Sequence, residues 1–147
     1  MLLKTGTVVD AALIAGPTST KNKDKARDPE IHSNKKGYQW YFSWKAHIGA
    51  DAECGLVHTL RGTSVDIAEA NTLLHGDEVL AFGDAGYQGV QTRPDANADV
   101  TWHVTVYLGK LRALNKDNKT GALLDKAEKL KADVQAKVEH PFLVIKR

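Results

Sequence analysis

The sequence predicts an α/β domain in which a mixed sheet is flanked by helices. Its 147 residues suit one compact domain with its own core, so we expect residues 1–147 to form a single domain. A buried strand and an alternating hairpin come first, followed by strands that helical segments connect. This order favours a sheet with both antiparallel and parallel neighbours and with helices packed on it.

Four segments carry the strand signal. Residues 6–14 are rich in β-branched residues and, apart from Asp10, apolar on both faces, which is typical of a buried strand. Residues 38–62 alternate about a glycine-bearing turn and predict a hairpin, with Trp40 and Trp44 on its apolar face and expected in the core. Residues 79–84 predict a second buried strand, and residues 101–108 alternate again.

Two helices and one long loop complete the prediction. Asp66 is placed to cap a helix over 66–75. From about residue 121 a single apolar stripe predicts a long helix, which Pro141 should either kink or end so that a new helix starts. The members of the stripe are Leu123, Ala127, Leu130, Val134, Val138, Phe142 and Ile145. Residues 17–37 have no apolar periodicity and predict a polar loop of about twenty residues, which is long for a compact domain.

The composition excludes several classes of protein. Apolar residues make up 42% and charged residues 26%, and no run approaches the roughly 18 apolar residues of a membrane span. A single cysteine, Cys54, excludes an intramolecular disulfide and favours the cytoplasm. The net charge of +2 does not point to any particular class of binding partner. The six histidines lack the spacing of a metal-binding motif. His47 and His58 are expected to be polar neighbours across the hairpin.

Three carboxylates occupy positions that suit a metal site. Asp10 interrupts a buried strand, Asp84 ends the next strand of that kind, and Glu139 lies beside the apolar stripe of the last helix. If the two strands are neighbours, the two aspartates meet, and such hard oxygen ligands suit Mg²⁺ or Mn²⁺. The residues alone leave other interpretations open: a strand-end hydrogen bond for Asp10, a turn for Asp84 and a solvated helix position for Glu139.

The predicted loop is rich in lysine. Its side chains could simply be solvated, or they could contact phosphates beside Asp10 with an affinity that falls as salt rises. The lysines concerned are Lys21, Lys23, Lys25, Lys35 and Lys36.

Several blocks of the sequence resemble the DDE transposases of bacterial insertion sequences. The matching blocks are GTVVDAALIAGPTSTKNKD, RDPEIH, KKGYQWYFSWKAHIGADAECGLVH, FGDAGYQGV and KVEHPFLVIKR, and they cover nearly the whole chain in order. The resemblance implies a ribonuclease-H-like fold and metal-dependent cleavage and strand transfer of DNA. It also implies that Asp10, Asp84 and Glu139 are catalytic and hold two Mg²⁺ or Mn²⁺ ions.

The resemblance further implies DNA as the partner, both transposon ends and target, with a possible homo-oligomer on the DNA. The family's signature lysine on the last helix is present as Lys146 and is expected to contact DNA. The signature's arginine and tyrosine positions hold Gln135 and Ala132 instead. A glutamine cannot replace the paired, permanently charged contact that an arginine makes with a phosphate.

We therefore expect a truncated catalytic core that lacks the family's N-terminal DNA-binding region. Two alternatives remain at this point. One is a catalytically inactive remnant that binds DNA weakly, and the other is a ribonuclease-H-like nuclease that hydrolyses DNA without joining it.

Overall fold

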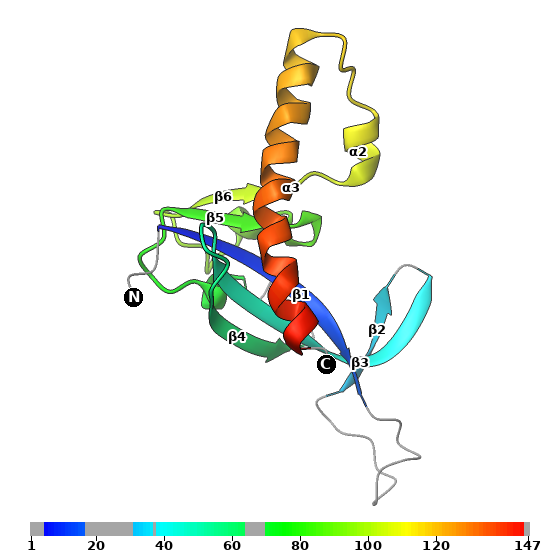
Figure 1. The fold of residues 1–147 in the computed structure, drawn as a ribbon, viewed down its shortest axis with the longest axis vertical. Coiled ribbons are helices and arrows are strands. Elements are labelled where there is room, and N and C mark those ends of the chain that lie inside the picture. The colour runs from blue at the N-terminus through cyan, green and yellow to red at the C-terminus, as the bar shows by residue number, and fades with distance from the viewer. Residues whose placement is uncertain (1–4, 17–30, 37, 64–69, 146–147) are drawn as a thin grey trace, which may run out of the picture.

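The computed structural model describes residues 5–16, 31–36, 38–63 and 70–145 (Figure 1). Its strands are β1 (Gly6–Ala15), β2 (His32–Lys36), β3 (Gln39–Asp51), β4 (Val57–Thr63), β5 (Leu80–Gly83) and β6 (Thr101–Val104). Its helices are η2 (Asn71–Leu73), η3 (Ala85–Tyr87), η4 (Val90–Thr92), α2 (Leu108–Arg112) and α3 (Lys119–Ile145), where η marks a single 3₁₀ turn.

The six strands form one mixed sheet, as the sequence predicts. The main path runs β2-β3-β1-β5-β6, and β4 pairs with β3 beside it. β1 is antiparallel to β3 and parallel to β5, which in turn is parallel to β6. The predicted hairpin is present as β3 and β4, and the two predicted buried strands, β1 and β5, are direct neighbours.

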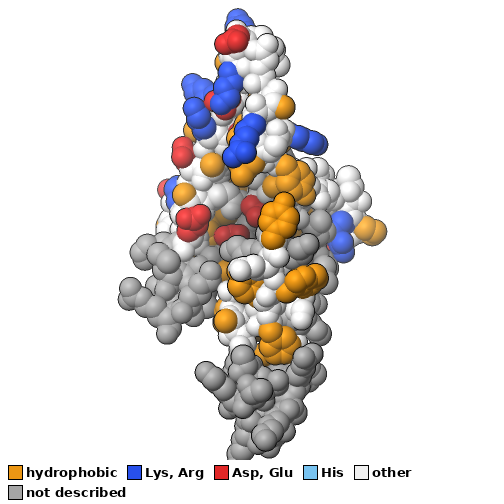
Figure 2. All heavy atoms as spheres, turned by 90° about the vertical axis from the view of Figure 1, so that its right-hand side faces the viewer, with side chains coloured by type: hydrophobic (Ala, Val, Ile, Leu, Met, Phe, Trp, Pro, Cys, Tyr) orange, Lys and Arg blue, Asp and Glu red, His pale blue; other side chains and the backbone are white. Residues whose placement is uncertain are grey.

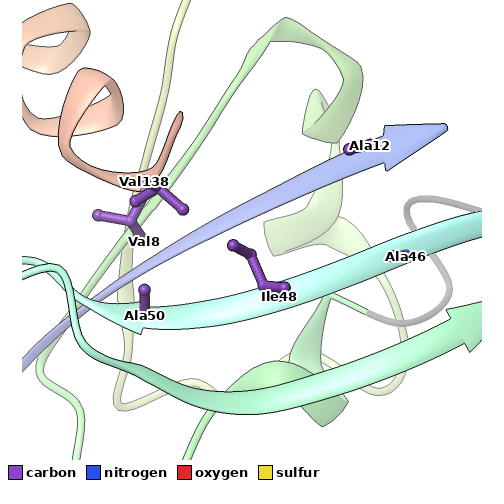
Figure 3. Close-up of a cluster of buried hydrophobic side chains, with 6 residues drawn as sticks. All are labelled: Val8, Ala12, Ala46, Ile48, Ala50 and Val138. Atoms are coloured by element: carbon purple, nitrogen blue, oxygen red, sulfur yellow. The ribbon is translucent and has the colours of Figure 1, made fainter. Parts of the chain in front are cut away.

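One face of the sheet packs against the C-terminal half of α3. Because side chains alternate along a strand, Val8 and Ala12 of β1 point to the same face, as do Ile48 and Ala50 of β3. These residues and Ala46 form a fully or nearly fully buried cluster with Val138 of α3 (Figure 3). This cluster fixes where α3 crosses β1.

The opposite face of the sheet is covered by short 3₁₀ turns. Val9 of β1 packs there with Leu73 of η2, Tyr87 of η3 and Val90 of η4, all of them buried. The turn at η2 comes so close to β3 that a Cβ added to Gly49 would lie 2.2 Å from the backbone oxygen of Leu73. Glycine at this position is what allows the close approach.

The first half of α3 extends beyond the sheet, with α2 beside it (Figure 1). Only Val134 and Val138 of the predicted stripe belong to the described core, whereas Leu123 and Leu130 are 62% and 59% exposed. The prediction of a long helix is confirmed, but its stripe is buried only where the sheet lies beneath it. Pro141 lies inside the helix.

Three other expectations from the sequence differ from the structure. The alternating segment 101–108 forms the strand β6 only as far as Val104, and Leu108 begins the helix α2. Residues 32–36, within the segment expected to be a loop, form β2 and pair with the first part of β3. Trp40 is 68% exposed because β3 there extends past β1 and pairs only with β2. Residues 17–30 and residues 66–69 of the predicted helix over 66–75 lie outside the described residues. The described part of that segment, residues 70–75, forms only the short turn η2 and no α-helix. Among the described helices, none has the length and apolar character that a membrane span needs.

Candidate active site at the ends of two neighbouring strands

The two aspartates singled out in the sequence lie next to each other. The parallel register pairs Val8 with Phe82 and Val9 with Gly83, so the next residues along the two strands are Asp10 and Asp84. Neighbouring strands lie about 4.8 Å apart. By alternation both aspartates share the face of Val8 and Phe82, which is the face that α3 crosses. The sheet therefore presents two carboxylates at one point beside this helix.

Each aspartate is oriented by a local hydrogen bond. One carboxylate oxygen of Asp10 accepts from the backbone N–H of Ala11 at 2.7 Å. The Oδ1 atom of Asp84 accepts from the backbone N–H of Gly86 at 2.9 Å, which starts the turn η3. Asp84, directly after β5, is exposed, and Asp10, within β1, is half-buried, so a ligand in solvent can approach both.

Helix α3 is tied to the same strand end through Gln135. With its amide oriented to satisfy the surrounding groups, the side-chain oxygen of Gln135 accepts from the backbone N–H groups of Gly83 and Asp84, both at 3.1 Å. One turn earlier, Lys131 donates to the backbone oxygen of Val104 at 3.0 Å. These contacts set the position of α3 over the ends of β5 and β6.

Glu139 is exposed on α3, four residues after Gln135 and directly after the buried Val138. Four residues advance an α-helix by about 6 Å and nearly complete one turn. Glu139 therefore lies on the same side of the helix as Gln135, which contacts the backbone of Asp84. Glu139 thus lies on the part of α3 that crosses the sheet, but among the described residues the carboxylate oxygens of Asp10, Asp84 and Glu139 do not form a compact group of three.

A pocket of about 540 Å³ opens beside Asp84. It lies between α3 and the segment that leads from β6 into α2, and its lining includes Thr105, Tyr107, Glu128 and Ala132. Ala132 contributes only a methyl group to this wall. The absence of a larger side chain there leaves room next to the aspartate.

The lysines singled out in the sequence are placed only in part. Lys35 and Lys36 lie on β2, where they pair with Trp40 and Gln39 of β3, but their side chains are outside the description. The remaining four, Lys21, Lys23, Lys25 and Lys146, lie outside the described residues.

Comparison with protein families decides the assignment. The profile of the transposase DDE domain matches residues 2–147. The chain belongs to the transposase DDE domain family. No solved structure matches it. The mixed α/β sheet of this DDE domain agrees with the ribonuclease-H-like fold of the family. Membership in the family implies a DNA substrate and the use of divalent metal ions.

A second polar cluster in the DDE domain was missed in the sequence. His58, His75 and Glu78 each offer a potential metal-ligand atom, and these three atoms lie within 4.8 Å of one another. The expectation that His58 would face His47 is wrong, because the register of β3 and β4 pairs His47 with Arg61. The spacing of His75 and Glu78, three residues apart just before a strand, is the one local signal that could have indicated this cluster.

Proposed function

We propose that this DDE domain is the catalytic core of a DNA transposase, in which Asp10, Asp84 and Glu139 hold two Mg²⁺ or Mn²⁺ ions. The observation that carries the proposal is the register of β1 and β5, which sets Asp10 beside Asp84 on the face that α3 crosses. Two adjacent carboxylates are costly without a cation, and hard oxygen donors fit these ions. Such ions, when bound, activate an attacking hydroxyl and stabilise the leaving oxygen of a phosphodiester.

The protein's own part in this chemistry is to hold the carboxylates rigidly. Asp10 lies within β1 and Asp84 directly follows its neighbour β5, and Gln135 anchors the helix that carries Glu139. In the first step a water oxygen bonds to phosphorus, and the bond from phosphorus to the 3′ oxygen breaks. In the second step the released 3′-hydroxyl attacks a phosphodiester of the target and frees a new 3′-hydroxyl. Each step exchanges one ester bond for another bond to oxygen, and neither needs a protein nucleophile.

DNA contacts are proposed for Lys146 and for the lysines of residues 17–37. Further support comes from α2 and α3, where basic side chains gather on the part that extends beyond the sheet (Figure 2). Exposed members include Lys110, Arg112, Lys119 and Lys126. We also propose that the domain acts in the cytoplasm on chromosomal DNA, as a homo-oligomer on the paired ends of the element.

A strand-cleavage assay tests the proposal. The purified chain is incubated with supercoiled plasmid and Mg²⁺ or Mn²⁺, and the nicked circle is measured. We expect Asp84→Asn to lower nicking by at least about 100-fold, because ligands of a catalytic ion contribute several kcal/mol to the transition state. The matched control is Asp99→Asn, an exposed aspartate in the loop before β6. Equal nicking by the wild type and Asp84→Asn would show that the assignment is wrong.

A joining assay separates a transposase from a plain nuclease. A labelled oligonucleotide with a free 3′-hydroxyl is supplied with the plasmid and the metal ion. Covalent transfer of the label into the plasmid requires strand transfer, which a nuclease that only hydrolyses never performs.

The second candidate function is an inactive remnant, and the contacts of Gln135 favour it. This side chain is engaged by the backbone of Gly83 and Asp84, and it carries no charge for a phosphate. A wild type that does not nick, together with a nicking double variant Ala132→Tyr/Gln135→Arg, would identify a remnant inactivated at these positions. If neither protein nicks, the catalytic proposal is rejected for this chain.

A further inference from the structure

Three side chains converge on the sheet face that α3 does not cover. His58 lies on β4, and His75 and Glu78 lie in the segment between η2 and β5. Glu78 is buried and the two histidines are half-buried. The hydroxyl of Thr7 on β1 donates to Oε1 of Glu78 at 2.9 Å and lies 3.2 Å from Nε2 of His58. The cluster therefore joins β1, β4 and the approach to β5.

This cluster is separate from the aspartate pair. Thr7 and Val9 point to the face covered by η2, η3 and η4, whereas Asp10 alternates to the face covered by α3. The sheet lies between the two groups. A ligand bound by the histidines would not share a donor atom with Asp10 or Asp84.

We propose that His58, His75 and Glu78 form a binding site for a divalent transition-metal ion, with Zn²⁺ the best chemical match. Two imidazoles and one carboxylate are a donor set that suits such borderline ions. Mg²⁺ fits this set poorly, because it takes oxygen ligands. Three protein ligands leave one position of a tetrahedral ion open to water, and the partial exposure of both histidines gives solvent access to it.

The distances within the cluster need little change to enclose an ion. Bonds of about 2.0–2.2 Å around tetrahedral Zn²⁺ place the ligand atoms roughly 3.3–3.5 Å apart. Nε2 of His75 and Oε1 of Glu78 are already 3.5 Å apart. The other separations are at most 4.8 Å, so closing the set requires movements of about 1 Å, which a histidine ring achieves by rotating.

The surrounding hydrogen bonds suit this role. Nδ1 of His58 lies 2.9 Å from the hydroxyl of Thr59, which fixes the ring and leaves Nε2 toward the cluster. Oε2 of Glu78 accepts from the backbone N–H of Gly76 at 2.7 Å, and Oε1 also accepts from the backbone N–H of His75. Desolvation by burial, and then the nearby His75, lower the pKa of His58.

Binding would change two contacts. Because the Thr7 hydroxyl donates to Glu78, its 3.2 Å contact with His58 is donated by Nε2–H of His58, and an ion bound to that nitrogen replaces it. Nδ1 of His75 accepts from the backbone N–H of Asp77 at 3.4 Å, which places the ring proton on Nε2 in the neutral form. Coordination through Nε2 moves that proton to Nδ1 and gives up the 3.4 Å contact with Asp77. The gain is a link between β4 and the segment before β5, so the ion is expected to stabilise the fold.

Zinc binding by the full chain tests the proposal. The protein is stripped with a chelator, and Zn²⁺ is titrated in competition with a chromophoric chelator. We expect one Zn²⁺ per chain with a dissociation constant in the micromolar range or tighter, and a rise in melting temperature on addition. Co²⁺ should give visible absorption bands of a four- or five-coordinate ion.

Variants locate the site. We expect His58→Gln and His75→Gln each to weaken Zn²⁺ binding by at least tenfold. The matched control is His103→Gln, since His103 lies on β6 and its ring stacks on Phe82. Cys54→Ser is a second control, because an exposed thiol can itself bind Zn²⁺. Asp10→Asn/Asp84→Asn should bind Zn²⁺ like the wild type, because the aspartates lie on the other face. Circular dichroism of each variant checks that it has folded.

The proposal is overturned if the wild type does not bind Zn²⁺ stoichiometrically. This result does not depend on whether any variant folds. It is also overturned if binding is lost in Cys54→Ser or in the double aspartate variant while His58→Gln and His75→Gln still bind. Either result would mean that the cluster only connects the strands through hydrogen bonds.

Discussion

On the face covered by α3, the half-buried Asp10 within β1 lies beside the exposed Asp84, which directly follows β5. On the opposite face, Glu78 is enclosed and accepts hydrogen bonds from Thr7, His75 and Gly76. Burial would raise the pKa of Glu78, but the hydrogen bonds outweigh it and hold the pKa below its usual value. The carboxylate of Asp84 is thus exposed on one face, whereas that of Glu78 is enclosed by hydrogen-bond donors on the other. Substitutions on the two faces should therefore separate activity from stability.

The largest expected effect is on the face opposite α3, at Gly49. In Gly49→Ala the new methyl group would meet the backbone oxygen of Leu73 at 2.2 Å, so η2 must move away from the sheet. We expect the free energy of unfolding to fall by about 3 kcal/mol or more, measured by urea denaturation. The matched control is Gly109→Ala, where a Cβ meets nothing within 4 Å and the helix α2 should gain slightly. Equal stability of the two variants would contradict the close packing of this face.

Next in size is Glu78→Gln. An amide cannot accept all the hydrogen bonds that the buried carboxylate accepts, and its NH₂ group would face donors. We expect a loss of about 2–3 kcal/mol in the free energy of unfolding, because hydrogen bonds to charged groups are the strong ones. The comparison is Glu53→Gln, an exposed glutamate in the turn after β3, which should change stability by less than about 0.5 kcal/mol. Similar losses in both would mean that Glu78 is not held as described.

On the α3 face, Gln135→Ala is expected to have an intermediate effect. It removes two acceptor contacts to the backbone N–H groups of Gly83 and Asp84, worth about 1–2 kcal/mol together. Lys126→Ala, at an exposed position on the same helix, is the control of similar helix propensity. Thermal unfolding measures both. A neutral Gln135→Ala would show that α3 does not depend on this contact for its place over β5.

The smallest expected change in stability is at Asp10. Asp10→Asn removes one of two adjacent carboxylates, so we expect the free energy of unfolding to change by less than about 1 kcal/mol without metal. Millimolar Mg²⁺ should raise the melting temperature of the wild type and leave that of the variant unchanged. A variant that Mg²⁺ stabilises as much as the wild type would argue against Asp10 as a ligand.

The elements with a clear hydrophobic period were predictable. The apolar runs gave β1 and β5, the alternation gave β3 and β4, and the stripe gave α3. Because Asp10 lies within one such run and Asp84 ends the other, the sequence could also indicate that they would meet if the strands were neighbours. The strands are neighbours. Their roles as ligands remain a prediction.

Other features depend on contacts that no local pattern records. The exposure of Leu123 and Leu130 follows from the extent of the sheet beneath α3, and the sequence does not state that extent. The meeting of His58 with His75 and Glu78 depends on how the segment before β5 folds back over β4. Trp40 is exposed because β1 does not pair with the start of β3.

The parallel pairing of β1 with β5 has a consequence for the order of folding. Gly6 pairs with Leu80, 74 positions later, whereas β3 and β4 are joined by a short turn. Closing a long loop costs more entropy than closing a short one, so the hairpin of β3 and β4 is expected to form early. β1 can join β3 before β5 arrives. A chain with β1, β3 and β4 in place therefore still lacks the aspartate pair, which is completed in a late folding step.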